Sequence, residues 1–424
     1  MLPLASRPGG MAAGSRCGAA LSGGSRPFRR LDAPEIASAS KIADPTTDKS
    51  LFFENAGMGV PAAKQPAVGN FGDRVASTAS EASRTQPRPL APGPRPLFFA
   101  LLLLSGCGKY ADFSLPRLPG GDPALTFALD TQPEPVLPRG SESDVLNPSV
   151  VRTPSGLLNF YSAFDGQSWR TMMALSNDGV HWATGHTIQR PDPRTWEASY
   201  MAANGSVLVQ DGQLWHWFEA GPKGALKIGL ARSTDASMWR KESAPVLDTG
   251  PYMSWDERDV ADPYAIRIGP YFYMYYLGQD RAEPPRQRIG VALSRDGVQW
   301  TKLRTNPILE LGDPGAFDEA GLGEPAVWNS HGFYWMLYTG RDSGERRRMG
   351  LARSTDGVHW QKLPTVFAGT QAWDAQVLCD ATVLIEGSEI RVWFGGGYAA
   401  SPDENLHGQI GYGILRPVHA TLAK

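Results

Sequence analysis

Residues 354–360 read STDGVHW, and nearly the same letters return as SNDGVHW at 176–182 and SRDGVQW at 294–300, with a degenerate copy, STDASMW, at 233–239. Strand-like apolar runs such as QRIGVALS and RRMGLARS lead into the copies. Asp-Gly between two such runs is a strong hairpin signal, because glycine adopts a positive φ without steric penalty. A spacing of about sixty residues indicates a fold built from copies of one supersecondary unit.

A second hairpin lies upstream of each copy. Its first strands read NPSVV, NGSVL, DPYAI, EPAVW and DATVL, and its second strands are aromatic, as in LWHWFEAG and FYMYYLG. The fifth unit ends in HGQIGYGIL and has no Asp-Gly turn. Five units of four short strands predict an all-β fold, a five-bladed β-propeller over residues 141–418. In such a fold the repeated turn is architectural and packs one blade on the next.

The N-terminal quarter has a different composition. Residues 1–94 are rich in Gly, Pro, Ala, Ser and Arg and are predicted to be disordered, or to precede the true start of the mature protein. In residues 95–107, RPLFFALLLLSGC, the apolar run is too short to cross a bilayer and suits a signal peptide, with a short buried strand as the alternative. Residues 108–140, with many Pro and Gly, are predicted to be a flexible tether.

The sequence LSGC at the end of this run resembles the lipobox of bacterial lipoproteins. The resemblance implies cleavage before Cys107, a lipid on Cys107 and an extracytoplasmic location at a membrane.

The composition of the chain excludes two classes of function. A formal net charge of −2 gives no electrostatic case for nucleic acid. The three cysteines, Cys17, Cys107 and Cys379, form neither a disulfide framework nor a metal-binding spacing, so no metal or cofactor is predicted.

One column of polar residues stands out when the five first strands are aligned. Its members are Asn147, Asn204, Asp262, Glu324 and Asp380. The first strand of each blade lines the channel of a propeller, so we expect these side chains to form a polar ring at one mouth. Converging charges cost desolvation and repulsion, which makes the ring a candidate functional site. The alternative is that these side chains only cap strand ends.

An aromatic-Asp pair precedes the ring residue by seven positions or so in three units. These pairs contain Asp256, Asp318 and Asp374, and the second unit has the looser copy WEASYMAANG. Because they recur so regularly, we interpret these acids as loop caps rather than as catalytic groups.

A five-bladed propeller with axial carboxylates at Asp-Pro and Glu-Pro strand starts resembles the glycoside hydrolase group that contains families 32, 43, 62, 68 and 130. By position, the resemblance implies that Glu324 is the general acid and that Asp262 tunes its protonation. The position of the general base holds Asn147 instead of an aspartate. An amide is not a useful base near neutral pH, and Asp144, three residues upstream, is a candidate substitute.

Other residues are implied to bind substrate. Arg258 and Arg341 could hold an anion, although surface charge is the alternative for both. Tyr264, Trp328 and Tyr398 could stack on a sugar or simply pack between blades, and His407 either reaches the channel or is an ordinary loop residue. The Asn-Pro start of the first unit also resembles family 130, whose members cleave mannosides, some of them by phosphorolysis.

The sequence thus predicts an extracytoplasmic lipoprotein that binds carbohydrate and cleaves glycosidic bonds, with water or phosphate as the acceptor. Inversion is expected, with the two acting carboxyls about 6.5–9.5 Å apart. The alternative is a carbohydrate-binding or scaffolding propeller that has lost its catalytic base, because Asn147 and Asn204 are neutral.

Overall fold

The structure is a computed structural model that describes residues 109–419, all within the second of two units, Leu97–Lys424. Every regular element in these residues is a β-strand. Nothing in the described part of the chain is a helix of the length and apolarity needed to cross a membrane. The predicted disordered segment, the signal peptide and the lipid attachment at Cys107 lie outside the described residues.

Most strands form antiparallel groups of four that are consecutive in sequence. The first group holds β3 (Asp144–Thr153), β4 (Gly156–Phe164), β5 (Trp169–Ser176) and β6 (His186–Gln189). The second holds β7 (Met201–Gln210), β8 (Gln213–Gly221), β9 (Lys227–Ser233) and β10 (Arg240–Lys241). The third holds β11 (Asp259–Ile268), β12 (Tyr271–Gln279), β13 (Gln287–Ser294) and β14 (Trp300–Leu303). The fourth holds β15 (Gly321–Ser330), β16 (Phe333–Arg341), β17 (Arg347–Ser354) and β18 (Gln361–Phe367).

The fifth group combines three strands from the C-terminal end of the described chain with one strand from its N-terminal part. It holds β19 (Val377–Glu386), β20 (Glu389–Gly397), β21 (Gln409–His419) and, as its fourth strand, β2 (Leu125–Thr131). β1 (Tyr110–Ala111) pairs in parallel with β14, and Leu115 and Phe127 are only 1% and 2% exposed. The prediction that residues 108–140 form a flexible tether is therefore wrong where the structure describes β1 and β2, which are paired, and where Leu115 and Phe127 are buried.

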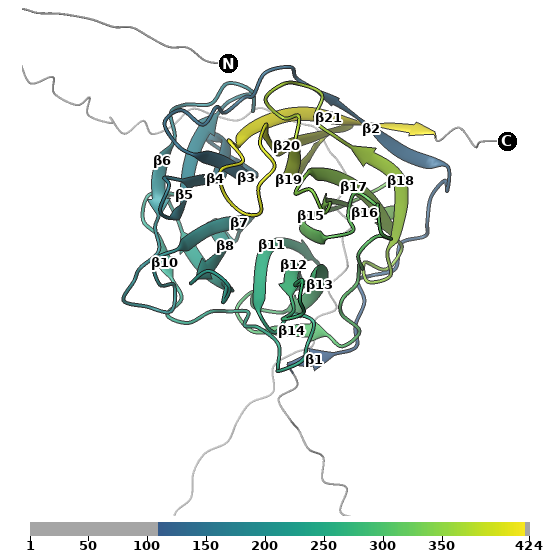
Figure 1. Ribbon diagram of the computed structural model, residues 1–424, viewed down its shortest axis with the longest axis horizontal. Helices are drawn as coiled ribbons and strands as arrows, with labels where there is room; N and C mark the ends of the chain where they lie inside the picture. Colours follow the sequence, from purple (N-terminus) through teal and green to yellow (C-terminus); the bar gives the residue numbers. More distant parts are fainter. Residues whose placement is uncertain (1–108, 420–424) are drawn as a thin grey trace, which may run out of the picture. The chain divides into compact units, whose positions relative to one another are not determined.

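The groups lie around a central axis, with the first strands β3, β7, β11, β15 and β19 innermost (Figure 1). Three junctions between groups are linked by short parallel pairings, Trp169↔Met201, Gln287↔Gly321 and Arg347↔Val377. The other two are linked by backbone hydrogen bonds, Val260 N to Leu226 O (3.1 Å) and Val145 N to Gly408 O (3.0 Å). The fold is all-β and propeller-like, and its first strands converge at the axis.

The repeated Ser-x-Asp-Gly turn has the packing role that the sequence predicts. Gly179 has a φ of 80°, and its amide donates to Ser176 Oγ (2.8 Å). Its carbonyl accepts a hydrogen bond from Trp393 Nε1 of the neighbouring fifth group (2.7 Å). Equivalent bonds run to the other two Asp-Gly turns, from Trp217 Nε1 to Gly297 O and from Tyr275 Oη to Gly357 O, both 2.9 Å. Each turn thus provides a fixed acceptor for an aromatic side chain of the adjacent group.

The acids that precede the first strands also have structural partners. Three of them pair with a lysine on the fourth strand of the same group: Glu197 with Lys241 (2.6 Å), Asp256 with Lys302 (2.5 Å) and Asp318 with Lys362 (2.5 Å). In the fifth group Asp374 Oδ1 accepts from the Gln371 amide (2.7 Å). These bonds confirm the interpretation of Asp256, Asp318 and Asp374 as loop caps.

Candidate active site

The five column residues share an unusual backbone conformation. Their φ angles are positive: 51° at Asn147, 42° at Asn204, 46° at Asp262, 52° at Glu324 and 55° at Asp380. Each lies where the register between the first and second strands shifts, as in a β-bulge. A residue other than glycine pays a conformational cost at such a φ, and bulges re-aim side chains. The same strained bulge in all five groups turns these side chains out of the strand pairing.

The five column residues line a cavity of about 320 Å³. They also line a second cavity of about 30 Å³, together with the prolines that follow three of them. The ring that the sequence predicts therefore separates a larger cavity from a small axial one. Because the larger cavity also collects side chains from second strands and from loops, it is the candidate site for a ligand.

Hydrogen bonds connect the column residues to one another. The Asp380 amide donates to Glu324 Oε2 (3.2 Å), and the Asn147 amide donates to Asp380 Oδ2 (3.3 Å). Asn204 Nδ2 donates to Asp262 Oδ1 (3.3 Å). Neighbouring first strands are thus joined directly through the ring, so each carboxylate is held in place by the adjacent strand.

Burial and the neighbouring charge of Glu324 raise the pKa values of two acidic side chains in the ring, Asp262 and Asp380. The pKa of Asp262 is raised from its usual 3.8 to about 7, mainly by burial and then by the charge of Glu324. The pKa of Asp380 is raised well above its usual value by the same two causes in the same order. Carboxyls this close titrate as a group. The cluster therefore retains protons near neutral pH and can supply one to a bound ligand.

A fourth carboxyl, Glu219, was not identified in the sequence. It lies on β8, is 3% exposed, and its Oε2 accepts a hydrogen bond from the Asp262 amide (3.2 Å). Burial, followed by the charge of Asp262, raises the pKa of Glu219 well above its usual value. The equivalent positions of the other second strands hold Ser162, Leu277, Thr339 and Gly395. The one feature of the sequence that could have identified Glu219 is that it is a single acidic residue within the aromatic run LWHWFEAG.

Four cationic side chains line the same cavity: Lys223, Arg258, Arg341 and Arg347. The sequence identified Arg258 and Arg341. The guanidinium of Arg341 pairs with Glu345 (2.7 Å), whereas Arg347 donates to the carbonyls of Ser401 (2.9 Å) and Pro402. Lys223 Nζ contacts Asp403 and Glu404, both at 3.0 Å, and so connects the loop after β8 to the loop before β21. The cavity therefore carries positive as well as negative groups.

Asp144, the proposed substitute base, does not line the cavity. It is 0% exposed, and its two carboxylate oxygens accept hydrogen bonds from the amides of Asn405 (2.6 Å) and Gly408 (2.9 Å). Asp259, at the equivalent position of β11, accepts from the Leu226 amide in the same manner (2.7 Å). Asp144 is thus occupied in holding the loop before β21, which corrects the prediction that it replaces the missing base.

The predicted aromatic contacts lie elsewhere in the fold. Trp328 is 6% exposed and packs edge-on against Phe127 (ring centroids 5.9 Å apart), so it is a core residue. Tyr264 lines the small axial cavity. His407 stacks on Tyr398 at 4.5 Å in the loop before β21. None of these side chains is part of the lining of the larger cavity in the described residues.

Replacing Asp262 by asparagine is expected to stabilise the folded protein at pH 8 by about 2 kcal/mol. Asn204 adopts the same backbone conformation in the second group, so asparagine fits. A carboxyl whose pKa rises on folding contributes stability below its unfolded pKa, and this contribution is lost as the pH rises from about 4 to about 7. The full shift corresponds to about 4 kcal/mol, which we halve because neighbouring carboxyls share the proton.

Denaturant midpoints at pH 4, 6 and 8 would test this prediction. The increase in the free energy of unfolding caused by Asp262→Asn should be near zero at pH 4 and should grow toward pH 8. Asp256→Asn removes the acidic partner of Lys302 and should instead destabilise the protein at all three pH values. A gain that is independent of pH would show that the charge of Asp262 is not the cause.

Residues 158–389 match the family model of the glycosyl hydrolases family 32 N-terminal domain. An uncharacterized protein of Mycobacterium tuberculosis (strain CDC 1551 / Oshkosh) is 30% identical over 158 residues, which cover 35% of this chain and 52% of that protein. The 1,2-beta-oligomannan phosphorylase of Thermoanaerobacter sp. (strain X514) is 26% identical over 132 residues, which cover 29% of this chain and 43% of that enzyme. The chain thus spans about half the length of the curated relatives it matches.

Solved structures agree in fold. The structure of a glycoside hydrolase superposes with a TM-score of 0.56 at 17% identity, covering 73% of this chain and 94% of that one. A structure from the work on the family 130 mannoside phosphorylases and hydrolases that target beta-1,2 mannosidic linkages in Candida mannan gives a TM-score of 0.53 at 15% identity, covering 70% and 96%. At these identities the structures show the fold alone.

The family model spans more than half of the 424 residues, so the chain belongs to the glycosyl hydrolases family 32 N-terminal domain family.

Proposed function

We propose that the five antiparallel groups are the blades of a propeller and that the larger cavity cleaves glycosidic bonds in an oligosaccharide. The observation that carries this proposal is the convergence of four carboxyls, Glu219, Asp262, Glu324 and Asp380, on one cavity. A departing sugar oxygen needs a proton. Glu324, at the start of the fourth blade, is the proposed donor, and it shares the cavity with Asp262 and Asp380.

The proposed acceptor is inorganic phosphate rather than water. Water needs a general base to become a nucleophile, but Asn147 occupies the base position and Asp144 is bonded to loop amides. Phosphate is already ionised and needs no base. The cationic side chains of the cavity, Arg347 among them, would attract it. The name of the Thermoanaerobacter relative, a phosphorylase of 1,2-beta-oligomannan, points to the same acceptor.

In this reaction a phosphate oxygen forms a bond to the anomeric carbon while the glycosidic carbon–oxygen bond breaks. The proton of Glu324 passes to the departing sugar oxygen. Attack from the face opposite the leaving group inverts the anomeric configuration. The products are a sugar 1-phosphate and an oligosaccharide shortened by one residue. The same relative makes β-1,2-linked mannosides the first substrate class to examine.

With phosphate present, β-1,2-mannobiose and longer β-1,2-oligomannosides are expected to yield mannose 1-phosphate at least about tenfold faster than free mannose forms without phosphate. The full chain would be assayed on these sugars and on aryl arabinosides and xylosides, with ³¹P and ¹H NMR to identify products. Equal rates with and without phosphate would contradict phosphate as acceptor and favour hydrolysis. Saturable sugar binding without any product would favour the non-catalytic alternative, a site that has lost its base.

We further propose that Cys107 carries a lipid, which would place the protein outside the cytoplasm at a membrane. The motif LSGC supports this proposal, and the paired strand β1 begins at Tyr110, only three residues later. The propeller would then lie directly at the membrane surface rather than on a long tether. Membrane partitioning that survives Cys107→Ser would contradict the lipid anchor.

A further inference from the structure

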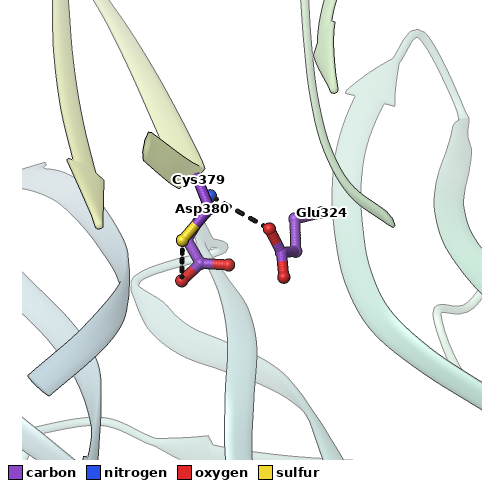
Figure 2. A group of neighbouring side chains, drawn as sticks. All are labelled: Glu324, Cys379 and Asp380. Carbon is purple, nitrogen blue, oxygen red and sulfur yellow. Dashed lines mark hydrogen bonds between the residues drawn. The ribbon is translucent and has the colours of Figure 1, made fainter. Parts of the chain in front are cut away.

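Cys379 brings a thiol into the carboxyl cluster. It lies on β19 beside Asp380, is 1% exposed, and shares the cavity lining with Glu324 of β15. The Cys379 Sγ and one oxygen each of Glu324 and Asp380 all lie within 4.8 Å of one another. Figure 2 shows the three side chains around one point, with the thiol donating to Asp380 Oδ2 (3.1 Å). The proposed glycosidic reaction gives this thiol no role.

The second carboxylate oxygen of Asp380 supplies an independent indication of a ligand. Asp380 is 4% exposed, yet its Oδ1 has no hydrogen-bond partner among the described residues. In Figure 2 this oxygen points toward the carboxylate of Glu324. A buried, unpaired carboxylate oxygen is costly, so such a group is normally satisfied by a proton, a water or a cation. The position between two carboxylates and a thiol suits a cation.

We propose that Glu324, Cys379 and Asp380 bind a thiophilic divalent cation of the Zn²⁺ type. Thiolate selects Zn²⁺ and Cd²⁺ over Mg²⁺ and Ca²⁺, which prefer oxygen ligands alone. Three protein ligands leave the fourth tetrahedral position for a water or a sugar oxygen from the cavity. Tetrahedral zinc has ligand atoms about 3–4 Å apart, so the three side chains need to close only slightly. On binding, the thiol proton leaves to solvent and the thiolate coordinates.

Occupation of this site would engage Glu324 and so prevent it from giving its proton to a sugar. The expected consequence is inhibition by micromolar Zn²⁺ or Cd²⁺, and this consequence alone rests on the proposed function. Binding of the cation does not depend on any activity. The two proposals can therefore fail separately.

Cadmium titration of the full chain, made without a histidine tag, tests the site directly. A cadmium–thiolate bond gives an ultraviolet charge-transfer band, which should rise and saturate at one Cd²⁺ per chain. Cys379→Ser should abolish the band. The double variant Cys17→Ser/Cys107→Ser is the matched control and should keep it. Asp380→Asn and Glu324→Gln should weaken Cd²⁺ binding by more than about tenfold, the loss caused by removing even an outer partner of a ligand.

Excess Mg²⁺ or Ca²⁺ should not displace the cadmium, whereas Zn²⁺ should. Melting temperatures of the metal-free variants would show that each one folds. The proposal is overturned if no band appears, or if the band survives Cys379→Ser and disappears in the Cys17→Ser/Cys107→Ser variant. A saturating band in a protein that cleaves no glycoside would support the metal site and count against the proposed function.

Discussion

Replacing Glu324 by glutamine is expected to lower kcat for an oligosaccharide substrate by about 100- to 10,000-fold, the usual contribution of a general acid. Glutamine preserves size and hydrogen bonding but has no proton to give to the departing sugar oxygen. The fold should persist, because the glutamine oxygen can still accept the hydrogen bond from the Asp380 amide. Its free energy of unfolding at pH 8 should equal or exceed that of the natural protein.

Comparing substrates with good and poor leaving groups distinguishes the loss of a general acid from a nonspecific disturbance of the active site. An aryl glycoside whose phenol departs readily as an anion needs no proton, so Glu324→Gln should retain most of its activity on that substrate. Glu389→Gln, at the exposed start of β20, is the matched control and should leave kcat unchanged on both substrates. An equal loss on good and poor leaving groups would contradict the acid role of Glu324.

Replacing Lys302 by methionine is expected to lower the free energy of unfolding by about 3–5 kcal/mol, the cost of leaving a buried charge without its partner. Lys302 Nζ lies 2.5 Å from Asp256 Oδ2, and the two side chains are 6% and 0% exposed. The ammonium also donates to the Asp248 carbonyl (2.6 Å). The bond joins the fourth strand of the third antiparallel group to the loop before its first strand, so its loss should loosen the whole group.

Two comparisons test the physical reason. The double variant Lys302→Met/Asp256→Asn removes both charges and should regain most of the lost stability in denaturant unfolding. Arg304→Met breaks a nearby exposed pair with Asp112, whose side chains are 61% and 74% exposed, and should cost less than about 0.5 kcal/mol. Equal decreases in the free energy of unfolding for Lys302→Met and Arg304→Met would show that burial does not set the contribution of the ion pair.

The repeated units, the column at the strand starts and the loop-capping acids could be predicted because each recurs in register. Periodicity carries this information even in a single sequence. Glu219 could not be found in that way, since its counterparts include Ser162 and Leu277 and no column marks it. Nor could the pairing of β2 with β21, because it joins segments far apart in the sequence through backbone bonds that no motif specifies.

Asp144 illustrates a different limit of the sequence. Its position three residues from Asn147 predicts a substitute base, but side chains three residues apart on a bulged strand need not share a face. The positive φ of Asn147 turns that side chain toward the cavity, while Asp144 turns to the loop before β21. Backbone strain at the five bulges, which the sequence does not display, is what assembles the carboxyl cluster.

A crystal structure of the Glu324→Gln variant with β-1,2-mannotriose is the most direct test of the central claim. We predict that the sugar occupies the larger cavity with its scissile glycosidic oxygen at hydrogen-bond distance, about 3 Å, from the side chain at position 324. A sugar bound outside the cavity, or one whose glycosidic oxygens all lie far from that side chain, would contradict it.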